Sequence, residues 1–96
     1  MHAMVRFFSG QGATALFELL EERKEEVETL LRAVPGLVSY DLVKTEEGGM
    51  TITVCEEKTG TDESLSVALG WLKENAAHLD VNPPGVSEGA VVLHLV

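Results

Sequence analysis

Three side chains that could bind a ligand or take part in catalysis stand at helical spacing in the second half of the chain. Trp71, Asn75 and His78 are four and then three positions apart, so a helix would place them along one stripe. A ligand on this stripe would meet an indole plane, an amide and an imidazole that titrates near neutrality. The stripe is a candidate pocket wall. The alternative is that Trp71 seals the core edge while Asn75 and His78 face water.

Three further candidates come from segments with strand character. Arg6 is flanked by apolar residues, so its guanidinium needs an anionic partner or an exit to water. Asp41 is one such partner, in a purely structural role, and an anionic or enolic ligand is the other. Tyr40 and His94 are candidates for ligand binding, with a place in the core or at a dimer contact as the structural alternative.

Nucleophilic and metal chemistry find little support in the chain. Its single cysteine, Cys55, precedes Glu56 and Glu57, whose negative charge raises rather than lowers a thiol pKa. The three histidines are scattered, without HxH or HExxH spacing. We therefore expect no catalytic cysteine, no metal site and no cofactor.

Charge and hydropathy exclude several classes of partner. With 7 basic and 16 acidic residues the net charge is −9, which repels the phosphate backbone of nucleic acids. No apolar run is long enough for a membrane span, and the first residues lack the pattern of a secretory signal. One cysteine fits a reducing compartment. We expect no nucleic acid, no membrane and a cytoplasmic location.

The apolar periodicity defines the elements that must position these side chains. It predicts strands at residues 4–8, 37–44, 50–56 and 90–96 and helices at 14–34 and 62–78. Pro35-Gly36 ends the first helix. The order β-α-β-β-α-β predicts one α+β domain over residues 1–96, ferredoxin-like, with a four-stranded antiparallel sheet and two helices on one face. The uncovered face then needs a partner, most simply a second copy, so we expect a homodimer.

The central hairpin predicts which side chains lie on each face of the sheet. Large apolar groups alternate along both strands and are expected under the helices, namely Val38, Tyr40, Leu42, Ile52 and Val54. The opposite face would carry Ser39, Asp41, Thr51, Thr53 and Cys55, interspersed with Leu37 and Val43. Such a semi-polar surface suits contact with another sheet.

With this layout, residues 5–96 resemble the antibiotic biosynthesis monooxygenase-like family of the dimeric α/β-barrel superfamily. The resemblance is carried by Pro35-Gly36-Leu37-Val38-Ser39-Tyr40 after the first helix, and by the strand at 50–56 that runs into Asp62-Glu63-Ser64. It implies ferredoxin-like homodimers whose two sheets face each other, with the ligand in a cleft between sheet and helices. Several such proteins oxidise polycyclic phenols with oxygen and without metal or flavin.

The chain also departs from the family pattern. Haem-degrading relatives use an asparagine on the first strand, and residues 4–8 contain none, which disfavours haem chemistry. A tryptophan often found near the end of the third strand is replaced by Val54-Cys55-Glu56, and residues 63–69 lack a histidine frequent early in the second helix.

The resemblance implies a cofactor-independent monooxygenase acting on a phenolic or enolic small molecule. His78 is then the predicted base, and Asn75 holds the oxyanion. Trp71, Tyr40, Arg6 and His94 bind the ligand. One alternative is a non-catalytic ligand-binding or accessory dimer of the same fold. Another is an interaction protein whose dimer surface is its whole function.

Overall fold

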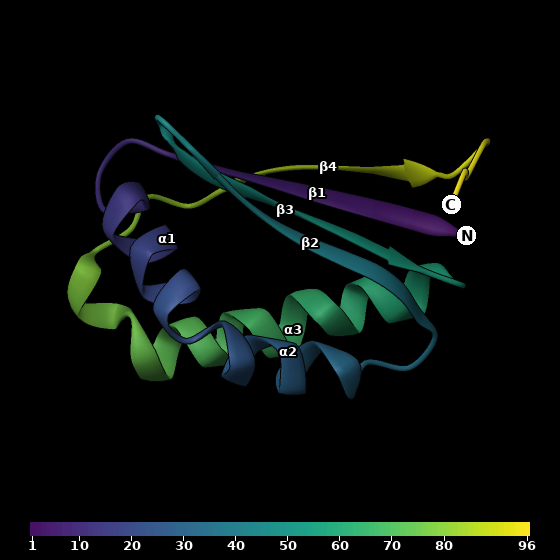
Figure 1. Ribbon diagram of the computed structural model, residues 1–96, viewed down its shortest axis with the longest axis horizontal. Coiled ribbons are helices and arrows are strands. Elements are labelled where there is room, and N and C mark those ends of the chain that lie inside the picture. The colour runs from purple at the N-terminus through teal and green to yellow at the C-terminus, as the bar shows by residue number, and fades with distance from the viewer.

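The fold is a four-stranded sheet with all its helices on one side (Figure 1). The computed structural model describes residues 1–96. In chain order the elements are β1 (His2–Ser9), α1 (Ala13–Glu22), α2 (Lys24–Arg32), β2 (Leu37–Thr45), β3 (Gly48–Cys55), α3 (Lys58–Asn75), the 3-10 turn η1 (Ala77–Leu79) and β4 (Gly85–Ala90). None of the helices is both long and apolar enough to span a membrane.

The sheet has the order β2-β3-β1-β4, and every neighbouring pair is antiparallel. The two β-α-β units interleave, so β1 and β3 are central and β2 and β4 form the edges. This arrangement confirms the predicted ferredoxin-like α+β fold. It leaves the face of the sheet opposite the helices uncovered in a single chain (Figure 1).

The first predicted helix is broken at one residue. Arg23, with φ −108° and ψ 30°, separates α1 from α2. The predicted apolar stripe is buried on both sides of the break, from Leu16 to Val34. The break changes the helix direction, so that α1 packs on β1 and β3 while α2 packs on β2 (Figure 1). The apolar periodicity is the same on both sides of Arg23, so the break could not be predicted from it.

The second predicted helix is displaced toward the N-terminus. It begins at Lys58 rather than residue 62, because the hydroxyls of Thr61 and Ser64 donate to the carbonyls of Lys58 and Thr61 within the first turns. Gly60 packs there against Cys55, where a Cβ would stand 2.7 Å from the cysteine Cβ. The regular helix ends at Asn75, so the predicted boundary at residue 78 is wrong.

The last strand is also displaced. We predicted residues 90–96, yet β4 is Gly85–Ala90, a stretch with little strand character. The chain meets β1 where Gly85 faces Phe7, and Ala90 already faces His2 at the first residue of that strand. β1 therefore has no residues left to pair with the more apolar residues 91–96.

The predicted faces are right for β2 from Ser39 onward and wrong for β3. At the start of β2 a bulge between Leu37 and Ser39 leaves Leu37 opposite the buried Cys55 and Val38 39% exposed, so the prediction for these two residues is wrong. Tyr40 and Leu42 lie opposite Thr53 and Thr51, and it is these threonines, together with Cys55, that are buried under the helices. The side chains of Met50, Ile52 and Val54 project from the uncovered face. Small residues under the helices leave room for large helical side chains such as Phe17 and Trp71, and this complementarity decides the register.

The uncovered face is consequently more apolar than predicted. Across β1, β3 and β2 it carries Val5, Phe7, Met50, Ile52, Val54 and Val43, interrupted by Ser39 and Asp41. Phe7 is 47% exposed. A contiguous apolar surface of this kind marks an interaction site.

Gly49 shows how tightly the helices seat on the sheet. A Cβ at this position would overlap the ring of Phe17, which packs beside Phe8 with the ring centroids 5.5 Å apart.

We expect Gly49→Ala to lower the free energy of unfolding by about 1–3 kcal/mol through overpacking. Gly70→Ala on α3 meets nothing within 4 Å and is expected to raise it by about 0.5–1 kcal/mol. Urea unfolding of both variants checks this, and equal effects would contradict it.

Candidate functional site

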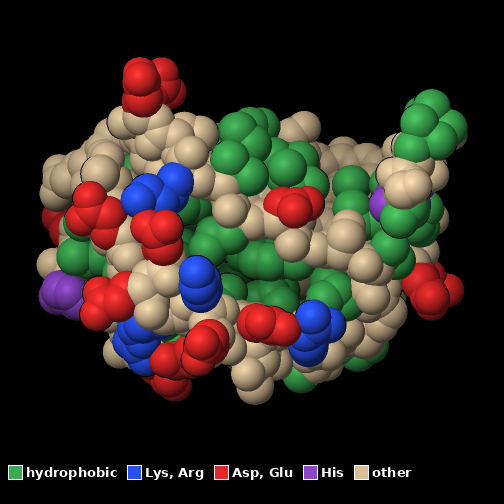
Figure 2. All heavy atoms as spheres, in the orientation of Figure 1, with side chains coloured by type: hydrophobic (Ala, Val, Ile, Leu, Met, Phe, Trp, Pro, Cys, Tyr) green, Lys and Arg blue, Asp and Glu red, His purple; other side chains and the backbone are tan.

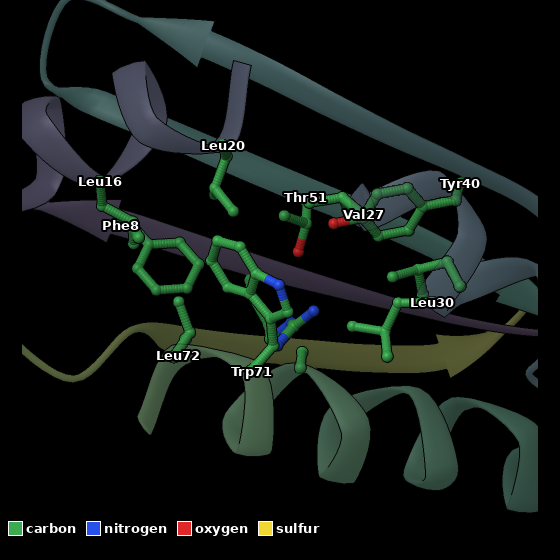
Figure 3. A pocket seen from close by; sticks show the side chains of 12 residues that line it. Phe8, Leu16, Leu20, Val27, Leu30, Tyr40, Thr51, Trp71 and Leu72 are labelled. Atoms are coloured by element: carbon green, nitrogen blue, oxygen red, sulfur yellow. The ribbon is translucent and has the colours of Figure 1, made fainter. Parts of the chain in front are cut away.

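A cavity lies between the sheet and the helices, and elements from both halves of the chain close it (Figure 3). Its volume is about 30 Å³, which is room for a water molecule or two rather than for an aromatic ligand. The wall is mostly apolar and includes Leu16, Leu20, Val27, Leu30 and Leu72. Its polar groups are few and come from the strands, with Arg6 on β1, Tyr40 on β2 and Thr51 on β3.

Arg6 is the most unusual group in the cavity wall. Its side chain is 3% exposed, and no carboxylate lies within the 4.0 Å of an ion pair. Asp41, the predicted structural partner, lies opposite Ile52 on the other face of the sheet and is exposed. Loss of hydration lowers the pKa of Arg6, only partly countered by the nearby Tyr40. A buried cation thus borders the cavity without a counter-charge.

Polar groups beside Arg6 form a strip on the helix side of the sheet, and of its two threonines only Thr51 lines the cavity. Thr51 pairs directly with Arg6 across β3 and β1, and Thr53 pairs with Tyr40 across β3 and β2. The hydroxyls of both threonines are buried without a hydrogen-bond partner. Buried hydroxyls are normally paired, so this strip presents unused hydrogen-bonding capacity next to a positive charge. Its chemistry suits an anion or ordered water.

Tyr40 stays neutral well into the alkaline range. Burial raises its pKa, and attraction to Arg6 offsets only part of that rise. The Tyr40 ring projects from β2 toward Thr51, as Figure 3 shows. It can therefore donate its hydroxyl proton to a ligand at neutral pH, but it is a poor base there.

The raised pKa of Tyr40 predicts a loss of stability in alkali. Above its ordinary pKa of about 10, the tyrosine ionises first in the unfolded chain, which therefore binds fewer protons than the native state, so stability falls as the pH rises. We expect the drop in the urea midpoint between about pH 8 and pH 10.5 to be smaller in Tyr40→Phe than in the natural chain. Parallel drops in both proteins would show that Tyr40 ionises freely in the folded state.

Trp71 forms the wall of the cavity on the α3 side and is anchored from outside it. In Figure 3 its indole rises from α3 toward the centre of the cavity. The indole Nε1 donates to Glu26 at 2.8 Å, and the Arg23 guanidinium lies 5.0 Å from the ring centroid. Arg23 also donates to the side-chain oxygen of Asn75 at 3.0 Å. The break between α1 and α2 thus supplies the residue that holds Trp71 in place.

The structure brings together three of the six predicted site residues. Arg6, Tyr40 and Trp71 line the cavity. Asn75 is occupied elsewhere, since its amide donates to the Trp71 carbonyl at 2.9 Å and its oxygen accepts from Arg23. His78 lies on the exposed turn η1 because the helix has ended, and His94 lies in the exposed segment after β4. The single stripe expected for Trp71, Asn75 and His78 is therefore wrong.

One wall residue, Thr51, and its strand neighbour Thr53 escaped the sequence analysis. Thr51 and Thr53 were assigned to the outer face because the valine and isoleucine of the same strand looked like core residues. The signal that would have found them is Gly48-Gly49 at the start of the strand. Gly49 begins a series of small residues at every second position, which continues with Thr51, Thr53 and Cys55. Such a series indicates the face that large helical side chains approach.

Other side chains add no second site. Cys55 is fully buried, and burial raises the pKa of its thiol. No three of the histidine, cysteine, aspartate and glutamate side chains are grouped as metal ligands would be.

The fold, but no sequence family, connects this chain to known proteins. No family model and no curated protein matches it. SnoaB, a cofactor-independent oxygenase from Streptomyces nogalater, aligns with a TM-score of 0.67 and 20% identity over 98% of this chain and 95% of its own. A dimeric ferredoxin-like protein from an uncultured marine organism gives 0.66 and 18%, over 99% and 95%. MhuD, a heme degrader from Mycobacterium tuberculosis, gives 0.69 and 17%, over 100% of both chains.

These likenesses confirm the predicted resemblance at the level of the fold. The aligned regions span nearly the whole of each chain, so sheet and helices correspond throughout. At such identities, shared architecture does not carry a shared reaction, and function has to be argued from the cavity.

Proposed function

We propose that this protein is a homodimer that binds a small aromatic phenolate or enolate between its sheet and helices and oxidises it with molecular oxygen. The observation that carries the proposal is the buried, unneutralised guanidinium of Arg6 in the cavity wall. An anionic oxygen placed there would receive charge-assisted hydrogen bonds in a site of low dielectric. The hydroxyl of Thr51, which lines the cavity and has no hydrogen-bond partner, is available as a further donor.

The proposed chemistry needs no group beyond the ligand and oxygen. A phenolate can pass one electron to oxygen, and the resulting radical and superoxide combine to form a new carbon–oxygen bond. Loss of water from this peroxide leaves a quinone, so one oxygen atom enters the product and the other leaves as water. The contribution of Arg6 is to stabilise the phenolate before this electron transfer.

The cavity wall also limits how the phenolate forms. It contains neither a carboxylate nor an imidazole, and the raised pKa of Tyr40 makes this residue a poor proton acceptor. We infer that the site selects the anion of the ligand rather than deprotonating it with a dedicated base. Affinity should then rise with pH through the ligand's own pKa.

The ligand also has to enlarge its site. A cavity of about 30 Å³ has at most about a tenth of the volume of an ordinary small-molecule pocket. Trp71 is the largest wall residue, and its anchors Arg23 and Glu26 lie at the exposed break between α1 and α2. Release of these contacts would let the indole turn and admit the ligand, so binding should change the tryptophan fluorescence.

Oxygen consumption tests the proposal directly. A panel of naphthohydroquinones and hydroxyanthracenes is incubated with the protein, and oxygen uptake and product are measured together. We expect one quinone formed per oxygen molecule consumed, with one atom of labelled oxygen in the product. The sequence prediction of His78 as base is tested in the same assay, because an anion-selecting site keeps full activity in His78→Ala. Loss of activity in that variant would favour the imidazole instead.

A second candidate is a binding protein without turnover. It is favoured because the cavity wall holds no carboxylate or imidazole that could accept a proton from the ligand. In that case the phenol would raise the melting temperature and be recovered unchanged, with no oxygen consumed. Such a result would retain the anion site and exclude the oxygenation.

A further inference from the structure

Three hydrogen-bond donors meet at the cavity, and none of them is used within the chain. They are the guanidinium of Arg6, the phenol of Tyr40 and the hydroxyl of Thr51. None of the side-chain hydrogen bonds of the structure involves any of the three. In Figure 3 the Tyr40 ring and Thr51 point toward one another across the cavity. The wall therefore offers three unused donors to a ligand.

The charge on Arg6 needs compensation from inside the cavity. A guanidinium keeps its proton at neutral pH, so burial does not neutralise it as burial neutralises a lysine or a carboxylic acid. Arg6 is the one buried cation of the chain, and no carboxylate forms an ion pair with it. Ordered water would accept the hydrogen bonds but bring no negative charge, whereas an anion does both. The buried guanidinium therefore favours an anion.

The size of the cavity selects a small anion with a single charge. A volume of about 30 Å³ holds a water molecule or two, which is also room for a halide ion but not for a sulfate, a phosphate or an organic acid. A divalent oxyanion would also lose more hydration than one guanidinium and two hydroxyls return. The remaining wall is apolar and contains no carboxylate that would repel a halide.

The exterior of the molecule does not attract such an ion. The net charge is −9, and acidic side chains lie across the face seen in Figure 2. The overall field therefore repels anions rather than gathering them at the surface. Halide binding that saturates would have to come from a specific site, which makes it a clear signal of the Arg6 cavity.

We propose that the cavity binds a chloride ion through Arg6, Tyr40 and Thr51 and exchanges it for the phenolate. The halide neutralises the guanidinium until the phenolate displaces it. This displacement rests on the proposed function, whereas the binding of the halide does not. Chloride then raises the KM for the phenol and leaves kcat unchanged, because both anions need the same donors.

The fluorescence of Trp71 measures the occupancy of this site. Trp71 is the only tryptophan of the chain and forms part of the cavity wall, and bromide quenches an indole on contact. Sodium bromide is titrated into the protein without phenol, and sodium gluconate, whose anion is too large for the cavity, holds the ionic strength constant. We expect saturable quenching with half-saturation at about 1–50 mM, as a few charge-assisted hydrogen bonds allow. Chloride, a much weaker quencher, should reverse it.

A matched pair of threonine variants separates the site from its surroundings. Thr51→Val removes a hydroxyl from the cavity wall and should weaken bromide binding about tenfold. Thr53→Val is the control, because this hydroxyl is also buried and unpaired but does not line the cavity. It should leave the affinity for bromide unchanged. Arg6→Met should abolish the saturable quenching and leave only a linear collisional component.

Urea unfolding measures the same binding without fluorescence quenching. Each tenfold rise in chloride above its Kd should raise the free energy of unfolding of the natural chain by about 1.4 kcal/mol relative to Arg6→Met. Any stability that Arg6→Met gains over the natural chain is therefore expected to be largest in chloride-free buffer.

Two outcomes would overturn the halide site. One is quenching of the natural chain that stays linear up to about 200 mM bromide, far above the expected Kd. The other is saturable quenching of equal strength in Arg6→Met. Neither measurement uses oxygen or phenol, so this failure is distinct from failure of the proposed function. A protein that oxidises phenols and ignores halides keeps the latter, and one that binds halide without turnover keeps only the site.

Discussion

Arg6→Met is expected to remove ligand binding and at the same time to stabilise the free protein. Arg6 is buried without a counter-charge, so the free protein bears a desolvation penalty that a methionine of similar length would not. We expect the free energy of unfolding to rise by about 1–3 kcal/mol, or roughly 4–8 °C in melting temperature per kcal/mol. The affinity for a phenolate should fall by about two to three orders of magnitude, because the buried partner of the anion is gone.

The opposite signs of these two effects are what identify Arg6 as a binding residue. A structural arginine would lower both quantities when replaced. Arg32→Met is the matched control, since Arg32 is exposed and pairs with Glu28 at 2.8 Å on the surface of α2. This control should leave both the unfolding energy and the affinity nearly unchanged. An unstable Arg6→Met protein would instead assign Arg6 to the support of the fold and remove the basis of the proposed function.

Phe7→Asp is expected to convert the proposed dimer into a folded monomer. Phe7 lies on the uncovered face of the sheet opposite Met50 and is 47% exposed in the single chain, so the monomer tolerates a charge there. In a two-fold contact between these faces, the carboxylate is buried twice, once from each copy. We expect dimerisation to weaken by roughly 10³-fold or more, since each unpaired buried charge costs several kcal/mol.

Analytical ultracentrifugation at concentrations from about 1 to 100 µM measures this change. Leu69→Asp is the matched control, because Leu69 is equally exposed and lies on α3, on the helical side of the sheet. It should sediment as the natural chain does. A natural chain that is monomeric throughout this range would exclude the dimer, while the anion site within one chain would stand.

The tertiary contacts of the cavity explain why three of the six predicted site residues line it and the other three do not. The sequence alone singles out Arg6, Tyr40 and Trp71, because each is a charged or large aromatic side chain within an apolar pattern. Such a side chain can be accommodated at only a few positions, and the wall of a cavity is one of them. His78 looked equally good as part of a helix, and its helical position depended on three more residues of regular structure. Helix ends are decided by competing contacts, here the Asn75 amide and the turn η1, which a periodic pattern does not contain.

The sequence by itself determined the order of strands and helices and hence the ferredoxin-like sheet, because hydrophobic periodicity and the Pro35-Gly36 stop are local properties of the chain. Only the tertiary structure decided the break at Arg23, the face that Thr51 and Thr53 present, and the early end of β4. Each depends on a partner distant in sequence. Arg23 donates a hydrogen bond to Asn75. Thr51 and Thr53 are small enough to leave room for the helical side chains that pack on them. β4 ends at Ala90, which pairs with His2 at the first residue of β1. A strand that slips by one residue reverses its faces, so packing against the helices settles what alternation alone leaves open.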